Sequence, residues 1–66
     1  MSAAAELARQ LDRDAIGLVD DFKAAGGRVL FGSGTYTAVA HGLRVTCAVG
    51  AYQAVRRWME RAGEAR

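Results

Sequence analysis

Residues 35–47, TYTAVAHGLRVTC, carry the pattern that most clearly predicts the fold of this chain. Its residues alternate in character on either side of His41-Gly42, a dipeptide suited to a two-residue β-turn. With this turn, the pairs on one face are small, apolar or aromatic: Tyr36 with Cys47, Ala38 with Val45, and Ala40 with Leu43. The opposite face carries Thr35, Thr37, Val39, Arg44 and Thr46. This separation predicts an antiparallel hairpin with one buried face.

A second two-residue turn at Ser33-Gly34 extends the inner face to a preceding strand. It pairs Phe31 with Tyr36 and Val29 with Ala38, which adds two apolar side chains to the same surface. This first strand is short. We therefore expect a sheet of three strands, with a two-stranded hairpin as the alternative.

Before the strands, apolar residues recur at steps of three and four through residues 4–25, as on one face of a helix. Ser2 is suited to cap this helix and Gly26-Gly27 to end it. The stripe keeps its phase across Gly17, so the pattern predicts one helix despite the cost of about 1 kcal/mol for a helical glycine. Ile16 lies off the stripe, and no contact within the chain accounts for its apolar side chain.

After the strands, a second amphipathic helix is predicted to begin near Gly50. Its inward residues are Ala51, Ala54, Val55, Trp58 and Ala62, with Tyr52 and Met59 at one margin. Its outward residues are Gln53, Arg56, Arg57, Glu60 and Arg61. The spacing of Arg56 and Glu60 predicts an ion pair between them.

The order of elements predicts a single compact α+β domain over residues 1–66, with two helices packed on one face of a small antiparallel sheet (α-β-β-β-α, or α-β-β-α). A chain of this length buries a thin core, and its lone cysteine cannot form an internal disulfide. Stability must therefore come from packing or from association. The register directs Cys47 inward, which predicts a buried, unreactive thiol.

Charge divides the chain unevenly. Residues 1–25 carry three cations and five acids, and residues 26–66 carry six arginines and two acids, so the halves have net charges of −2 and +4. An acidic partner would suit the second half. The N-terminal residues lack a basic leader, and the later apolar runs are too short to cross a bilayer, which predicts a soluble, cytoplasmic protein without a membrane partner.

Residue types with catalytic or ligand chemistry are not spaced as a site requires. Four aspartates, Asp12, Asp14, Asp20 and Asp21, are spread around the predicted helix as a solvated surface. His41 lies at a hairpin tip. The loop Gly32-Ser33-Gly34-Thr35 lacks the lysine of a phosphate-binding loop and leads into a strand. We expect no enzymatic activity, no cofactor and no metal.

The candidate partner-binding residues are Ile16, Arg44, Tyr52, Arg56, Arg57, Met59 and Arg61. The apolar members favour a protein partner or a homodimer. The arginines favour nucleic acid as the alternative, through the C-terminal helix. The sequence thus predicts a non-catalytic protein-interaction module, with a nucleic-acid-binding module as the second reading.

The order helix, three strands, helix resembles that of double-stranded-RNA-binding domains over the whole chain. Those domains contact phosphates with lysines at the start of the last helix, whereas the corresponding residues here, Gly50-Ala51-Tyr52-Gln53, are uncharged. The resemblance therefore implies the order of helices and strands and not the RNA contacts. This chain is similar to small phage proteins, including head–tail joining proteins and anti-CRISPR inhibitors, in its length and in its small number of helices and strands. That resemblance implies an inhibitor or a virion connector.

Overall fold

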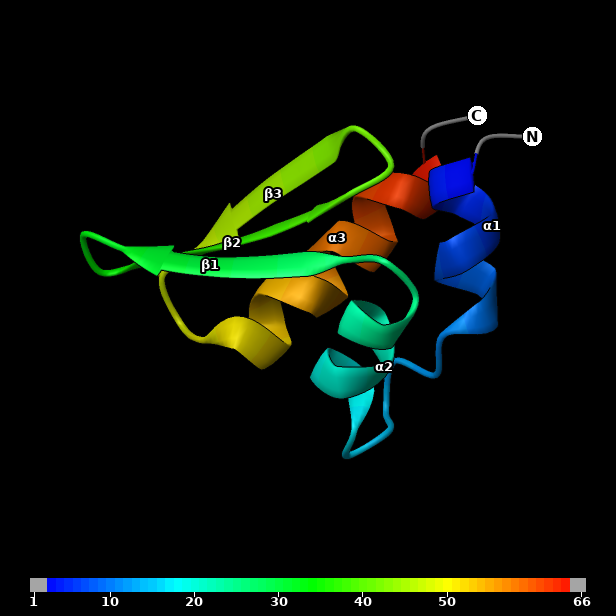
Figure 1. The fold of residues 1–66 in the computed structure, drawn as a ribbon, viewed down its shortest axis with the longest axis horizontal. Helices are drawn as coiled ribbons and strands as arrows, with labels where there is room; N and C mark the ends of the chain where they lie inside the picture. The colour runs from blue at the N-terminus through cyan, green and yellow to red at the C-terminus, as the bar shows by residue number, and fades with distance from the viewer. Residues whose placement is uncertain (1–2, 65–66) are drawn as a thin grey trace.

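Over its described residues, the chain folds as three helices on one side of a small sheet, as Figure 1 shows for a computed structural model. The structure describes residues 3–64, with Glu64 described by its backbone only. The elements of these residues are α1 (Ala3–Gln10), α2 (Leu18–Ala24), β1 (Arg28–Gly32), β2 (Thr35–Ala40), β3 (Leu43–Cys47) and α3 (Ala51–Glu64). The sheet is antiparallel in the order β1-β2-β3, which confirms the predicted α+β class. The predicted N-cap Ser2 lies outside the described residues.

The strand register predicted from the sequence is confirmed at every pair. Phe31 lies opposite Tyr36, which in turn lies opposite Cys47, and Val29, Ala38 and Val45 form the next row. Both turns have two residues with positive φ: Ser33 (54°) and Gly34 (75°), then His41 (51°) and Gly42 (79°). This is the type I′ geometry whose twist matches that of the strands.

The predicted single N-terminal helix is wrong, because residues 11–17 break it into α1 and α2. The carboxylate of Asp12 accepts a hydrogen bond from the backbone N–H of Asp14 (3.0 Å), and the Asp12 carbonyl accepts one from Ala15 N–H (3.0 Å). Such local bonds from aspartate compete with helical hydrogen bonds. Gly17 then precedes the first residue of α2.

Packing explains why the break is favourable. A straight helix over residues 4–25 would be about 33 Å long at 1.5 Å per residue, whereas strands of five or six residues span about 17–20 Å. Such a helix would extend well beyond the sheet. With the break, α1 packs along α3, and α2 packs against α3 and the sheet edge at β1.

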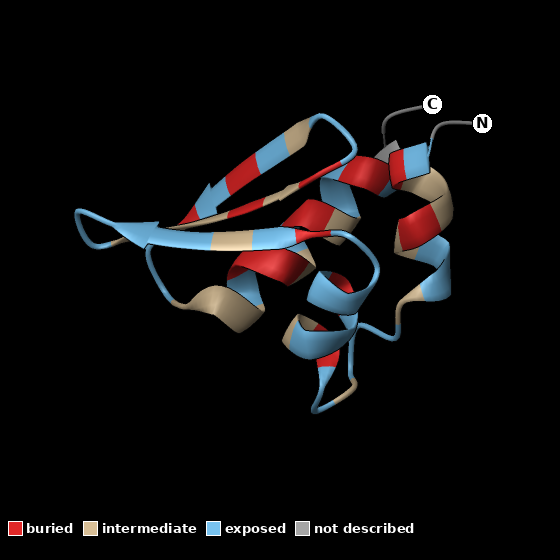
Figure 2. Ribbon diagram, in the orientation of Figure 1, coloured by how far each residue is buried: buried red, intermediate tan, exposed pale blue. Residues whose placement is uncertain are grey.

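Trp58 is the centre of the core. It is fully buried in α3, its indole Nε1–H donates to the carbonyl of Leu43 (3.0 Å), and its ring meets that of Phe22 edge-on at 5.1 Å between centroids. Gly27 is required beside Phe22, because a Cβ at this position would lie 2.5 Å from the ring. Figure 2 shows the buried positions on α3 and on the sheet above it. The buried hydrophobic residues are Ala4, Leu7, Leu18, Phe22, Ala38, Ala40, Val45, Cys47, Ala54, Val55, Trp58 and Ala62.

Helices cover the inner face of the sheet incompletely. α3 packs on β2 and β3, and α2 contacts β1. Along the last cross-strand row, Cys47 is buried as predicted, Tyr36 is half-buried and Phe31 is 65% exposed. The register of Phe31 was predicted correctly, but its burial was not, because the β1–β2 turn projects beyond the described helices (Figure 1). Its ring contacts Tyr36, with 4.6 Å between centroids.

Candidate functional site

A groove of about 530 Å³ runs between the edge strand β3 and helix α3. We call it the arginine groove. The residues that line it are Arg44, Val45 and Thr46 of β3 and Arg57, Glu60 and Arg61 of α3. It brings together Arg44, Arg57 and Arg61, three of the residues that the sequence nominated for partner binding.

Simple periodicities position these side chains. Arg44 and Thr46 alternate with the buried Val45, so both point away from the core. Arg57 and Arg61 are separated by four residues, about 6 Å along the helix axis, on the exposed face of α3. The arginine groove therefore presents guanidinium groups from two different elements.

Charge in the arginine groove is left unbalanced. Its one acid, Glu60, pairs with Arg13 of the loop 11–17 at 3.0 Å between Oε1 and the guanidinium nitrogen. Within the described part of the chain, Arg44, Arg57 and Arg61 make no ion pair. Unpaired arginines offer forked donors that match carboxylate or phosphate oxygens.

The backbone adds a second set of groups at the same edge. The two-residue turn at His41-Gly42 closes on the pair Ala40–Leu43, and hydrogen-bonded pairs then alternate along β2 and β3. Arg44 and Thr46 fall at the alternate positions, so their N–H and C=O groups point away from β2. No other strand of the described chain lies beyond β3.

The remaining nominated residues of α3 lie on its other side and have contacts within the chain. The Tyr52 hydroxyl donates to the carbonyl of Arg13 (2.8 Å), and the Arg56 guanidinium lies over the Tyr52 ring at 5.6 Å from its centroid. Glu60 pairs with Arg13, so the predicted Arg56–Glu60 ion pair is wrong. Arg56 is half-buried instead of facing solvent. Arg13 thus ties the loop 11–17 to α3 at two points.

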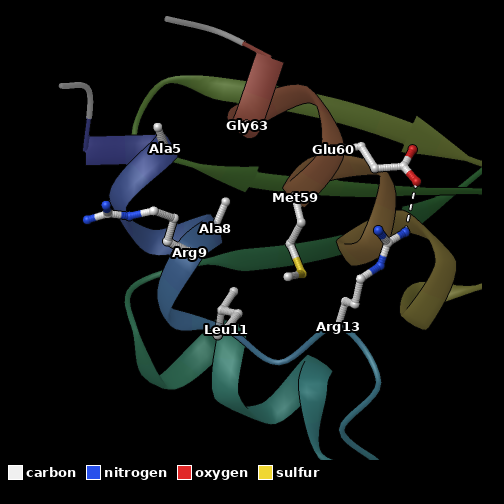
Figure 3. Close-up of a pocket in the computed structure, with 8 residues that line it drawn as sticks. All are labelled: Ala5, Ala8, Arg9, Leu11, Arg13, Met59, Glu60 and Gly63. Carbon is white, nitrogen blue, oxygen red and sulfur yellow. Dashed lines mark hydrogen bonds and ion pairs between the residues drawn. The ribbon is translucent and has the colours of Figure 1, made fainter.

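Met59 lines a second hollow, of about 260 Å³, between α1 and α3. Figure 3 shows its side chain extending from α3 into this space, with Leu11 of the loop 11–17 below it and the Arg13–Glu60 pair at one side. Half of the lining residues are alanine, leucine or methionine: Ala5, Ala8, Leu11 and Met59. A recognition site needs converging polar groups, and this hollow has them at its rim only.

Ile16 is fully exposed in the loop 11–17, as its place off the helical stripe predicted. Three further exposed apolar residues were missed: Leu30 (54% exposed), Phe31 (65%) and Val49 (77%). The strand register could have identified Leu30, because it lies opposite Thr37 on the outer face. Nothing local to Phe31 indicates that the helices stop short of it.

Tyr52→Phe is expected to lower the free energy of unfolding by about 0.5–1 kcal/mol, because it removes the hydrogen bond to the Arg13 carbonyl. Urea denaturation followed by circular dichroism measures this. Tyr36→Phe is the matched control, since the Tyr36 hydroxyl has no hydrogen-bond partner among the described residues. Equal stability of the two variants would contradict a structural role for the Tyr52 hydroxyl.

Residues 3–64 hold no group of three histidine, cysteine, aspartate or glutamate side chains placed to bind a metal ion. None of the helices in that range has the length and apolar character needed to cross a membrane. The arginine groove brings together three arginines from two elements, a set of donors suited to anionic groups. No protein-family model, curated protein or solved structure matches the chain.

Proposed function

We propose that the chain is a non-catalytic protein-interaction module that binds an extended acidic segment of a partner protein in the arginine groove. The observation that carries this proposal is that Arg44, Arg57 and Arg61 make no ion pair with the described residues and lie along a strand edge that no other described strand covers. Pairing with the outward N–H and C=O groups of β3 would supply affinity, and the arginines would select acidic side chains. A cytoplasmic location is part of the proposal, since Cys47 is a lone, buried thiol.

An extended peptide suits this place for geometric reasons. A new strand beside β3 would lie about 4.8 Å away, next to the side chains of Arg44 and Thr46. Its alternate residues would face the guanidinium groups of Arg57 and Arg61 on α3. The inhibitor and connector roles of the small phage proteins that the sequence resembles would use a protein contact of this kind.

The second reading, nucleic-acid binding, uses Arg56, Arg57 and Arg61 of α3, with Arg44 as an optional fourth contact. Arg56 is half-buried over Tyr52 and does not line the arginine groove, so the four do not form one surface. The outer face of the sheet carries Arg28 and Arg44 beside threonine, valine and leucine, but no aromatic side chain on which a base could stack. These two observations favour a peptide ligand over a nucleic acid.

The probe for this proposal is a fluorescein-labelled hexapeptide of alternating glutamate and valine, with binding measured by fluorescence anisotropy at two salt concentrations. The matched ligand replaces glutamate by glutamine and should bind at least about tenfold more weakly, because it lacks charge. Arg57→Glu should weaken binding of the acidic peptide by about the same factor or more, since like charges repel. Lys23→Glu, the same charge reversal at an exposed position of α2, should not.

Single-stranded and duplex oligonucleotides form the competing arm of the experiment. Tighter binding of either one than of the acidic peptide, with a steep loss of affinity at higher salt, would establish the nucleic-acid reading instead. Failure of both ligand classes to bind, or equal effects of Arg57→Glu and Lys23→Glu, would overturn the proposed function.

A further inference from the structure

The second free edge of the sheet, strand β1, differs from β3 in being apolar. Its sequence, Arg28-Val29-Leu30-Phe31-Gly32, has one charged residue, at its end. It contains no proline, and its pairing with β2 runs without a bulge. Natural edge strands that avoid pairing carry charges, prolines or bulges, and the centre of β1 has none of these.

The turn at Ser33-Gly34 determines which backbone groups of β1 are free. It closes on the pair Gly32–Thr35, and the hydrogen-bonded pairs then alternate, so Leu30 and Arg28 bond to β2. Val29 and Phe31 fall between them and direct their N–H and C=O groups away from the sheet. The free groups are therefore spaced symmetrically about Leu30.

We propose that β1 pairs in antiparallel fashion with β1 of a second copy of this chain, with Leu30 opposite Leu30 of that copy. Val29 of each copy then exchanges hydrogen bonds with Phe31 of the other, and Leu30 occupies the non-hydrogen-bonded position on the two-fold axis. Arg28 comes opposite Gly32, so the one cation of the strand faces no like charge. The two sheets become one continuous sheet.

The same arrangement covers the apolar side chains that the single chain leaves exposed. Residues opposite each other in a sheet point to the same face, so Phe31 of one copy lies beside Val29 of the other. Val29 is half-buried in the strand that α2 contacts, so the exposed ring gains the neighbouring helix that its own chain does not supply. On the outer face, the two Leu30 side chains cover each other.

Strand β3 is a poorer edge for self-pairing. Pairing two copies there would bring Arg44, Arg57 and Arg61 of one copy against the same residues of the other. Like charges at a strand edge oppose pairing. Repulsion between arginines thus disfavours self-pairing at β3 and favours it at β1. The arginine groove stays open in this dimer, so dimerisation does not depend on the function proposed for the groove.

Sedimentation equilibrium over micromolar to millimolar concentrations tests the proposal with the full chain. The parent should show twice the mass of one chain at the upper concentrations. Leu30→Lys should raise the dimer dissociation constant at least about tenfold, because the two lysines face each other directly. Gln53→Lys, which adds the same charge at an exposed position of α3, should leave the dissociation constant unchanged. Unchanged circular dichroism of both variants shows that each is folded.

Cross-linking tests the register itself. Cα atoms at non-hydrogen-bonded antiparallel positions lie about 4.5 Å apart, within the range that a disulfide spans. Leu30→Cys should therefore form a covalent dimer rapidly under mild oxidation, whereas Gln53→Cys should not. A parent that remains monomeric at millimolar concentration, a Leu30→Lys variant that dimerises like the parent, or equal cross-linking of the two cysteine variants would each overturn the proposal.

Discussion

Val45→Asp is expected to unfold the protein or to lower its free energy of unfolding by more than about 3 kcal/mol. Val45 lies in the core between the sheet and α3, and no cation is buried among the core residues there. The edge of Val45 also lines the arginine groove, so an aspartate would either be desolvated in the core cluster or turn out of it toward the arginines, and either arrangement loses the packing of the Val45 side chain. Because a domain of this size has a free energy of unfolding of only a few kcal/mol, this cost approaches the total stability of the protein.

Thr46→Asp is the matched control for this prediction. Thr46 is the next residue of β3, it is exposed, and it lies near Arg44, Arg57 and Arg61, so a carboxylate there should be tolerated. Urea denaturation and circular dichroism of both variants give the comparison. Equal losses of stability would show that Val45 and Thr46 do not lie on opposite faces of the sheet.

Trp58→Ala should have the second large effect, lowering the free energy of unfolding by about 3–5 kcal/mol. The substitution removes the largest buried side chain, its edge-on contact with Phe22 and its hydrogen bond to the Leu43 carbonyl. Loss of the far-UV circular dichroism signal at room temperature, or a strongly lowered urea midpoint, is the expected observation.

Two further variants separate the parts of this effect. Trp58→Phe keeps an aromatic ring but removes the donor to Leu43, so it should cost less than Trp58→Ala and more than a surface change. Met59→Ala, at the adjacent, half-buried position of α3, should cost clearly less than Trp58→Ala. A Met59→Ala cost equal to that of Trp58→Ala would contradict the central place of Trp58 in the core.

The sheet and the inner side of α3 could be predicted because their signals are local. A two-residue turn with positive φ determines the register on both sides of it, and the alternation of side chains then follows residue by residue. The inward positions of α3, including Trp58, follow from helical periodicity in the same way. Local patterns also predict that Arg44, Arg57 and Arg61 are exposed cations. They do not predict that these residues of β3 and α3 line the same groove.

The hairpins, their register and the buried stripe of α3 follow from the sequence, because each depends on neighbouring residues and on a fixed period. The interruption of the N-terminal helix at residues 11–17 depends on tertiary packing, since one amphipathic helix and two shorter ones share the same apolar pattern. Two shorter helices are favoured because a single long helix would extend beyond the end of the sheet. The tertiary structure likewise decided that Arg13, not Arg56, pairs with Glu60, and that Phe31 is uncovered. Both depend on where distant elements end, which no local period specifies.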